Sequence, residues 1–260
     1  RALWRDRRAA RARAQAPAFL TLRGGMEELV AALAASIGSE RLRFGFRAAF
    51  IEAEGGGYRV RGADGASLAA PVLIMAAPAP AAAQLLRGLD LELANELAAV
   101  TYASSMTVNL AYAPAPPLPA GTGALMARDE SIRMLACTFM HRKFPARAPA
   151  GTALLRLFYG GRRDEAVLGR SDDDVLALAR RELRLLFGIE AQPVAALVSR
   201  WPAAMAQPAL GHLARLRRIE AALTRHSRLA LAGNAYGGVG IGDCIASGQH
   251  AAARVASGYV

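Results

Sequence analysis

The most informative segment of the chain is Leu229-Ala-Leu-Ala-Gly233, followed by Tyr236-Gly-Gly-Val-Gly-Ile-Gly242 and Asp243. The apolar run is typical of a buried strand, the glycines predict a turn, and Asp243 is expected to open a helix that extends to about Val255. Glycines let a ligand approach the main chain, and the positive end of a helix favours a group that carries or gains negative charge. This pattern alone leaves two possibilities open: a ligand-binding turn, or a tight strand-to-helix crossover that binds nothing.

The chain before this segment mixes helix and strand patterns. A helix is predicted where Met26 and four further apolar residues share one stripe that ends at Gly38, and Ser171 with three aspartates predicts a capped helix start. The helices are expected at 26–37, 79–87, 91–99, 172–187 and 210–223. Residues 19–22 are expected to form a strand or an extended entry. The other strands are expected at 44–54, 58–61, 72–75, 105–112, 132–139, 152–159 and 194–200, the last with Trp201 and Pro202 at its end and a loop behind it. These elements predict a mixed α/β fold.

Composition excludes several classes of protein. The chain has 260 residues, of which 53% are hydrophobic and 20% charged, so it can build a packed core. Two cysteines, Cys137 and Cys244, are too few for a disulfide scaffold and predict a reducing compartment. No apolar run approaches the roughly 18 residues of a membrane-spanning helix, and no cluster of residues has the spacing of a metal site.

The net charge of +11 comes almost entirely from arginine, because Lys143 is the only lysine. This skew, beside abundant alanine, is typical of a GC-rich coding bias and weakens the charge as a functional signal. Six arginines surround Trp4 within the first thirteen residues. They are consistent with a solvated helix face, and also with a polyanion or lipid-surface patch.

Several motifs, taken in order, carry a resemblance. The segment from Leu231 to Gly248 resembles the C-terminal flavin-binding signature of protoporphyrinogen oxidases, the porphyrinogen-oxidising branch of the monoamine-oxidase-like flavoproteins. Further matching motifs follow the same order along the chain: Phe19-Leu-Thr-Leu-Arg-Gly-Gly-Met26, Pro71-Val-Leu-Ile-Met-Ala-Ala-Pro78, Ala136-Cys-Thr-Phe139, Leu154-Leu-Arg-Leu-Phe158, Arg200-Trp-Pro-Ala-Ala-Met205 and Gly211-His-Leu213. The resemblance covers nearly the whole chain, but only the C-terminal part of the family.

The resemblance implies a fold in which a flavin domain and an antiparallel-sheet substrate domain are interleaved. Residues 1–18 would be the tail of a helical, membrane-facing subdomain, residues 19–78 and 201–260 would belong to the flavin domain, and residues 79–200 to the substrate domain. The N-terminal dinucleotide-binding βαβ unit is missing, since no glycine cluster here has the G-x-G-x-x-G spacing. We therefore expect the chain alone to hold FAD poorly.

The implied activity is FAD-dependent oxidation of a porphyrinogen, with oxygen as acceptor. By resemblance, the backbone of Val239, Gly240 and Ile241 and the helix that starts near Asp243 would face the flavin ring. The remaining cofactor-binding residues that the resemblance implies are Gly233, Trp201 and Ala48. Asp243 is equally well explained as a helix N-cap, and no residue stands out as a catalytic acid or base.

The resemblance also implies partners and a location. The partners would be a porphyrinogen, oxygen and the missing N-terminal half of the same protein, and no nucleic acid is expected. The location would be cytoplasmic, with the arginine segment as a peripheral contact on the inner face of the membrane. Two other functions stay open: another flavin oxidase of the superfamily that acts on amines or polyenes, and a basic nucleic-acid-binding or interaction module without catalysis.

Overall fold

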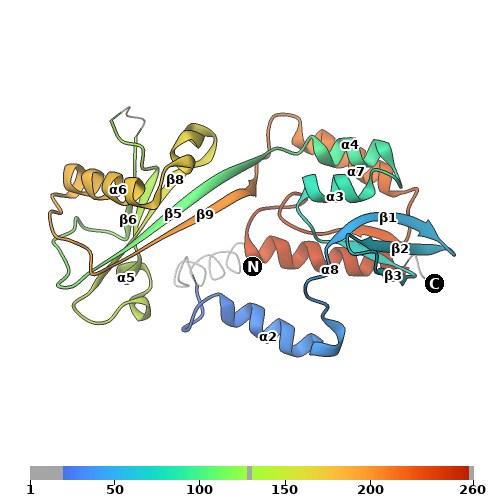
Figure 1. Cartoon of the computed structure of the whole chain (residues 1–260), viewed down its shortest axis with the longest axis horizontal. Coiled ribbons are helices and arrows are strands. Elements are labelled where there is room, and N and C mark those ends of the chain that lie inside the picture. The colour runs from blue at the N-terminus through green and yellow to red at the C-terminus, as the bar shows by residue number, and fades with distance from the viewer. Residues whose placement is uncertain (1–19, 128–130, 258–260) are drawn as a thin grey trace, which may run out of the picture.

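The computed structural model describes residues 20–127 and 131–257 (Figure 1). The predictions for residues 1–18 and for Phe19 therefore lie outside the described part of the chain. The molecule has two lobes, which are joined by the long strands β5 (Tyr102–Tyr112) and β9 (Ala195–Ala206). We call residues 102–206 the sheet lobe, and residues 20–101 with 207–257 the mixed lobe.

The sheet lobe is built on a five-stranded antiparallel sheet in the order β6-β7-β8-β5-β9. The shorter strands are β6 (Gly123–Leu125), β7 (Ala136–Phe139) and β8 (Ala153–Gly160). Helix α6 (Asp172–Phe187) covers one face of this sheet. It begins where the Ser171 hydroxyl accepts a hydrogen bond from the Asp174 N–H, and it ends at the left-handed Gly188. The remaining elements are short: α5 (Met140–Lys143), η2 (Pro145–Arg147), η3 (Gly161–Arg163) and η4 (Glu165–Gly169).

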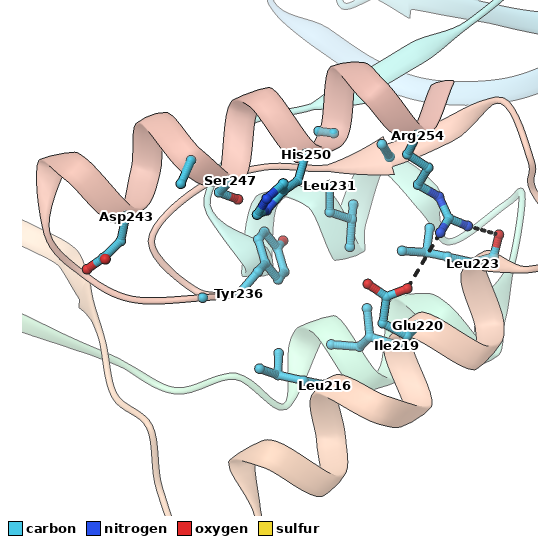
Figure 2. Close-up of a pocket in the computed structure, with 14 residues that line it drawn as sticks. Leu216, Ile219, Glu220, Leu223, Leu231, Tyr236, Asp243, Ser247, His250 and Arg254 are labelled. Carbon is cyan, nitrogen blue, oxygen red and sulfur yellow. Dashed lines mark hydrogen bonds and ion pairs between the residues drawn. The ribbon is translucent and has the colours of Figure 1, made fainter. Parts of the chain in front are cut away.

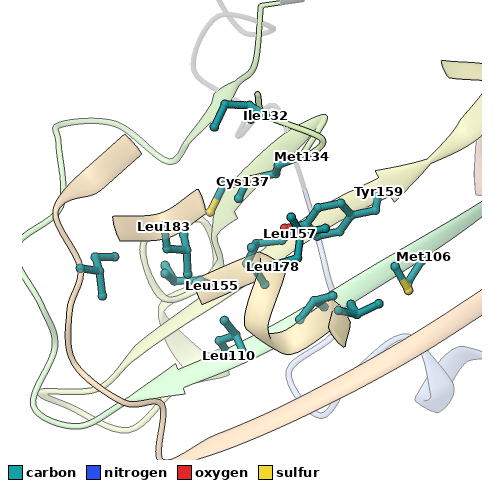
Figure 3. Packing of buried hydrophobic residues seen from close by; sticks show 14 of the residues in the cluster. Met106, Leu110, Ile132, Met134, Cys137, Leu155, Leu157, Tyr159, Leu178 and Leu183 are labelled. Atoms are coloured by element: carbon teal, nitrogen blue, oxygen red, sulfur yellow. The ribbon is translucent and has the colours of Figure 1, made fainter. Parts of the chain in front are cut away.

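Burial alternates along β5 from Ser105 onward and along β8 up to Tyr159, which places every second side chain of these stretches in the core under α6 (Figure 3). Large side chains such as Tyr159 and Leu157 are fully buried there. Glu182 of α6 is buried among them. Its carboxylate accepts hydrogen bonds from the N–H groups of Arg133 (2.7 Å) and Met134 (3.2 Å) and from the Tyr159 hydroxyl (3.0 Å). The buried carboxylate is thus supplied with three donors.

The mixed lobe contains a parallel strand pair, β4 (Leu73–Met75) and β10 (Leu229–Leu231). Alternate residues of β10 face opposite sides: Ala230 packs against α8 (Ile241–Ser257), whereas Leu229 packs against the helices on the other side. Those helices are α3 (Ala79–Leu86), α4 (Leu91–Ala98) and α7 (His212–Leu223). A separate antiparallel sheet is formed by β1 (Ala48–Glu54), β2 (Gly57–Gly62) and β3 (Ser67–Ala70).

Asp90 ties two of these helices together. Its carboxylate caps α4 by accepting from the Leu93 N–H at 3.0 Å, and it also accepts from Arg225 (2.8 Å) and His226 (2.9 Å) after α7. Burial alone would raise the pKa of Asp90, but these hydrogen bonds outweigh it and lower the pKa to about 2.

Helix α2 (Glu27–Ile37) differs from the other long helices because none of its residues is buried. It is preceded by the segment from residue 20 and followed by η1 (Ser39–Arg41). Its predicted apolar stripe is present but lies open, with Val30 and Leu33 more than half exposed. An amphipathic helix whose apolar stripe lies this open, in the part of the chain that the structure describes, is typical of a surface that contacts further protein.

The helices and most strands lie where the sequence predicts them. The predicted entry at 19–22 forms no strand over its described residues 20–22, where Thr21 and Leu22 bond to the Arg147 side chain. Strand β1 starts at Ala48 rather than at residue 44, and the short strands β3 and β6 were not predicted.

Two larger differences lie in the sheet lobe. Residues 132–135 are not strand, because the N–H groups of Arg133 and Met134 bond to Glu182 instead of a neighbouring strand. Strand β9 continues through Trp201 and Pro202 to Ala206, where a loop was predicted. An edge strand tolerates this proline, and the register of β9 shifts opposite Ala103 and Ser105.

Packing also groups the helices differently from the predicted domains. Helices α3 and α4 pack in the mixed lobe against β4, β10 and α7, although residues 79–200 were predicted to form the substrate domain. The predicted domain boundaries describe the longer protein and stay a prediction.

Candidate functional site

The glycine-dense turn joins β10 to α8 and leaves its backbone accessible. Val239 is 61% exposed and Ile241 is 54% exposed. A Cβ atom built on Gly233, Gly237 or Gly242 would meet no other heavy atom within 4 Å. Space therefore lies directly beside the main chain at these three positions.

The sequence predicts that Asp243 opens α8, but in the structure Asp243 is the third residue of this helix. The first helical hydrogen bond is accepted by the Gly240 carbonyl, from the Cys244 N–H at 3.0 Å, which makes Gly240 the N-cap. The Asp243 carboxylate reaches back and accepts from the Gly240 N–H at 3.1 Å. This is one half of a capping box, in which the third residue satisfies the N-cap amide. Glycine at 240 allows the helix to start two residues earlier than Asp243 suggested.

Two of the predicted amides are therefore already used within the protein. The Gly240 N–H bonds to Asp243, and the Gly233 N–H donates to the Ser247 hydroxyl of α8 at 3.1 Å. The first N–H groups of an α-helix have no acceptor inside the helix. The amides of Ile241 and Gly242 occupy this position in α8, and the helix dipole adds positive potential there.

A hollow of about 370 Å³ lies beside the turn, between α7 and α8 (Figure 2). Its floor is the edge of β10, and its walls include Tyr236, Asp243, His250 and Leu216. The hydroxyl of Tyr236 is buried without a hydrogen-bond partner among the described residues, and burial raises the pKa of this side chain. An unpartnered buried hydroxyl beside a hollow is consistent with a site that is completed by another group.

The backbone of β10 supports the same conclusion. The Arg228 carbonyl accepts from the Leu73 N–H at 2.9 Å, and the Ala232 N–H donates to the Met75 carbonyl at 2.9 Å. These peptide groups therefore face β4. Because residues of a parallel strand alternate in direction, the peptide groups of Leu231 point to the opposite edge, at the hollow. A parallel sheet of two strands with an open edge is unusual, since such sheets are normally wider and covered.

A polar network connects the turn to the sheet lobe. Asn234, at the start of the turn, accepts from the Tyr102 hydroxyl (3.4 Å) and donates to the Ala204 carbonyl (3.4 Å) of β9. The Tyr102 oxygen also accepts from the Ala79 N–H at 3.1 Å, at the start of α3. Neither Tyr102 nor Asn234 was predicted as a site residue, because their partners are far away in the chain. His212 lies at the start of α7, as expected, with Nε2 3.1 Å from the Ala235 carbonyl.

The other predicted cofactor residues lie apart from the turn. Trp201 sits on β9 opposite Ser105, is 51% exposed, and donates from Nε1 to the Thr107 hydroxyl at 3.4 Å. Ala48 is the first residue of β1, is half-buried, and pairs with Gly62. Within residues 20–127 and 131–257, no hydrogen bond joins either residue to the turn. Their contact with a cofactor stays a prediction.

Ala203 of β9 has a left-handed backbone, with φ of 44°. Its N–H donates to the Ser104 hydroxyl at 2.9 Å, where the register of β5 and β9 shifts. A non-glycine residue in this region is strained, and such strain often marks functional sites. The strained position lies next to Ala204, which the Asn234 side chain contacts.

Comparison with known proteins identifies the family. The model of the flavin containing amine oxidoreductases matches residues 4–256. The chain belongs to this family. The predicted membership in the monoamine-oxidase-like flavoproteins and the predicted mixed fold are thereby confirmed.

The curated relatives that match this chain include proteins named as porphyrinogen oxidases. The chain is 34% identical over 239 residues to a coproporphyrinogen III oxidase of Mycobacterium tuberculosis, covering 92% of this chain and 51% of the relative. It is 28% identical to the coproporphyrinogen III oxidase of Bacillus subtilis (90% and 50% covered) and 29% identical to the chloroplastic protoporphyrinogen oxidase of Nicotiana tabacum (90% and 46% covered). The chain spans about half the length of these relatives.

Solved structures of oxidases also match this chain. A structure assigned as a protoporphyrinogen oxidase from Exiguobacterium sp. 255-15 matches with a TM-score of 0.82 and 28% identity, over 95% of this chain and 54% of that one. Cyclohexylamine oxidase from Brevibacterium oxydans matches with a TM-score of 0.71 and 19% identity, over 90% of this chain and 52% of that one, which shows a shared fold.

Two further properties concern the described residues alone. Within residues 20–127 and 131–257 no group of three or more metal-ligating side chains comes together. None of the helices in the same ranges is long and apolar enough to cross a membrane.

Proposed function

We propose that this chain is the C-terminal half of an FAD-dependent porphyrinogen oxidase of heme biosynthesis, with oxygen as the electron acceptor. The observation that carries the proposal is the bare glycine turn at the start of α8, which stands beside open space and next to the strands of the sheet lobe. The names of the relatives support the substrate class. Protoporphyrinogen IX and coproporphyrinogen III remain alternative substrates.

The residues of the turn suit a flavin. FAD would supply the hydride acceptor, and its ring becomes more negative when it is reduced. The amides of Ile241 and Gly242 and the positive end of α8 would stabilise that charge, by about 1 kcal/mol for a helix terminus. Asp243 would hold the turn in shape through the hydrogen bond that it accepts from the Gly240 N–H. Direct contact of Asp243 with the cofactor stays a prediction.

The remaining predicted contacts belong to the same proposal. The backbone around Val239 would border the ring, Trp201 would pack on it from β9, and Ala48 would meet the adenine. Gly233 would allow close approach at the end of β10, where a Cβ meets open space.

The missing half of the protein would complete the mixed lobe. We propose that a dinucleotide-binding unit adds a parallel strand at the open edge of β10, where the peptide groups of Leu231 point into the hollow. It would also cover the apolar stripe of α2, including Val30 and Leu33. The chain alone should therefore bind FAD weakly, since the phosphate-binding turn lies in the other half.

We propose that the whole protein works in the cytoplasm, because Cys137 and Cys244 form no disulfide. Peripheral contact with the inner face of the membrane, through the arginines near Trp4, belongs to this proposal as well.

An assay of the whole protein, with both halves and FAD, tests the function. Porphyrin fluorescence from coproporphyrinogen III or protoporphyrinogen IX, together with oxygen consumption, is the expected result. Peroxide from amines without porphyrin formation would assign the protein to the amine oxidases instead. Salt-sensitive binding of nucleic acid without any oxidation would favour the interaction module.

A variant of the turn tests the cofactor site directly. Gly242→Leu places a side chain where the structure leaves open space, so the whole protein should lose most of its bound flavin while it keeps its helical content. Gly88→Leu is the matched control, because Gly88 also has free space around it but lies after α3, away from the turn. Full flavin content in Gly242→Leu would contradict the proposed site.

A further inference from the structure

The sheet of the sheet lobe has one covered face and one open face. The face under α6 is closed by the core, whereas the side chains on the opposite face of β5 and β8 are only half-buried. The register places Thr138, Arg156, Asn109 and Leu197 in one row across four strands of this open face. Such a row of directly opposed residues presents its side chains side by side.

Arg156 is the charged residue of this row. Its Nε donates to the Asn109 side-chain oxygen at 2.8 Å, which fixes the plane of the guanidinium. Within residues 20–127 and 131–257 no carboxylate forms an ion pair with Arg156. Burial lowers the pKa of Arg156, and the positive charge of Arg147 lowers it further.

Arg147 adds a second charge near Arg156, and no carboxylate among the described residues pairs with it. Its Nη2 donates to the Thr21 hydroxyl (2.7 Å) and to the Leu22 carbonyl (3.2 Å), both of which are uncharged. Its Nε is buried without a partner among the described residues. Two arginines held together without an acid are costly, unless an anion joins them for part of the reaction cycle.

The geometry of an arginine fits a carboxylate. A guanidinium offers parallel N–H groups that match the two oxygens of a carboxylate, and such bonds are stronger than neutral ones. Since Nε of Arg156 is engaged by Asn109, its terminal nitrogens are left for a ligand.

The position of Arg156 fits the substrate of the proposed reaction. Along β5, Asn109 lies four residues beyond Ser105, which pairs with Trp201. At the rise of a strand this is a distance of about 13 Å. The other end of β5 carries Tyr102, which bonds to Asn234 of the glycine turn. A macrocycle that lies on the open face, with its reacting carbon toward the turn, would extend its side chains toward Arg156.

We propose that Arg156 binds a carboxylate on the periphery of the substrate, with Asn109 as its positioning residue. This inference rests on the proposed function, because it takes its ligand from the acidic side chains of a porphyrinogen. Arg156 would be a specificity-determining residue, and Arg147 would contribute its positive charge from the side.

The alternative is a purely structural role, in which Arg156 only links β8 to β5 through Asn109. The two roles differ in what the variant Arg156→Gln changes. Glutamine can still bond to Asn109 but carries no charge, so a structural role predicts a small change in melting temperature and no change in substrate affinity.

The test uses the whole flavin-loaded protein and coproporphyrinogen III. Arg156→Gln should raise KM by about 10- to 100-fold, the loss expected for a charged hydrogen bond, with little change in kcat. Arg156→Lys should recover part of the affinity, because lysine keeps the positive charge but lacks the parallel N–H groups of the guanidinium. Arg184→Gln, a matched loss of one positive charge at an exposed position of α6, should leave KM unchanged.

A binding measurement separates this inference from the proposed function. Fluorescence titration with coproporphyrin III, which carries four carboxylates, should show the same loss of affinity in Arg156→Gln, whereas a porphyrin with cationic substituents should not. An unchanged KM and unchanged coproporphyrin affinity in an active enzyme would overturn the role of Arg156. A wild-type protein that oxidises no porphyrinogen would overturn the proposed function instead. If Arg156→Gln does not fold, a KM for Arg156→Lys equal to that of the wild type would count against the role.

Discussion

The two lobes of the molecule differ in how far they enclose their own apolar residues. In the sheet lobe, large side chains such as Leu157 and Phe139 are fully buried beneath α6. In the mixed lobe, α2 buries none of its residues, and the edge of β10 opens onto a hollow. The glycine turn, which is the proposed cofactor site, borders these open surfaces, so it lies in the lobe that we propose the rest of the protein completes.

The largest contrast should appear when one leucine is shortened in each lobe. Leu157→Ala removes a fully buried side chain from the sheet lobe and should lower the free energy of unfolding by about 2–5 kcal/mol. Leu33→Ala on α2, where the side chain is 53% exposed, should change it by less than about 0.5 kcal/mol. Urea unfolding followed by circular dichroism measures both variants. A loss for Leu33→Ala as large as that for Leu157→Ala would mean that α2 is packed in the isolated chain.

The same pair of variants extends the comparison to the whole protein. If the missing half covers α2, Leu33→Ala should become clearly destabilising there, by about 1–3 kcal/mol for an apolar side chain that becomes buried. The effect of Leu157→Ala should stay the same, because the sheet lobe already encloses that residue.

Acid should weaken the mixed lobe through Asp90. The hydrogen bonds to this carboxylate keep its pKa at about 2, below the usual 3.8. A carboxylate whose pKa is lowered by folding stabilises the folded state at any pH above its pKa in the unfolded chain. This stabilisation is lost as the pH falls from about 4 to about 2. The difference corresponds to about 2 kcal/mol.

Asp90→Asn isolates that contribution. Asparagine at this position still caps α4, but the stability of the variant protein should not show this loss between pH 4 and pH 2. Unfolding titrations at pH 5 and pH 2.5 compare the wild type with the variant. Equal pH dependence in both proteins would show that Asp90 is not the group responsible.

The smallest expected effect concerns the junction between the lobes. Ala203→Gly relieves the left-handed backbone of β9 and should raise the free energy of unfolding by up to about 1 kcal/mol, partly offset by the greater freedom of glycine in the unfolded chain. Thermal unfolding measures this difference. A lower free energy of unfolding in Ala203→Gly would mean that the Ala203 side chain stabilises the fold by more than its left-handed backbone destabilises it.

The sequence predicted well what is determined locally. The Ser171 cap, the aspartates that follow it and Gly188 define both ends of α6, because each signal acts within one turn of the helix. The stripe of α2 was likewise visible in the spacing of its apolar residues, although nothing in that spacing reveals whether a partner is present.

Features that depend on distant partners were not predicted. Glu182 takes the N–H groups of Arg133 and Met134, about fifty residues earlier, and thereby prevents a strand that their sequence favours. In the candidate site, the turn itself was found from its glycines, whereas the contact of Asn234 with Tyr102 joins residues 132 positions apart. The start of α8 was misplaced because Asp243 caps the helix from its third position rather than its first.

Hydrogen exchange of the chain alone, compared with the whole protein carrying FAD, tests most directly whether the mixed lobe is the incomplete cofactor-binding part. We predict slower exchange in the whole protein at α2, at Leu231 and in the turn at 236–242, with exchange in β5 and β8 of the sheet lobe unchanged. Exchange rates in those three regions that are the same with and without the other half and FAD would contradict it.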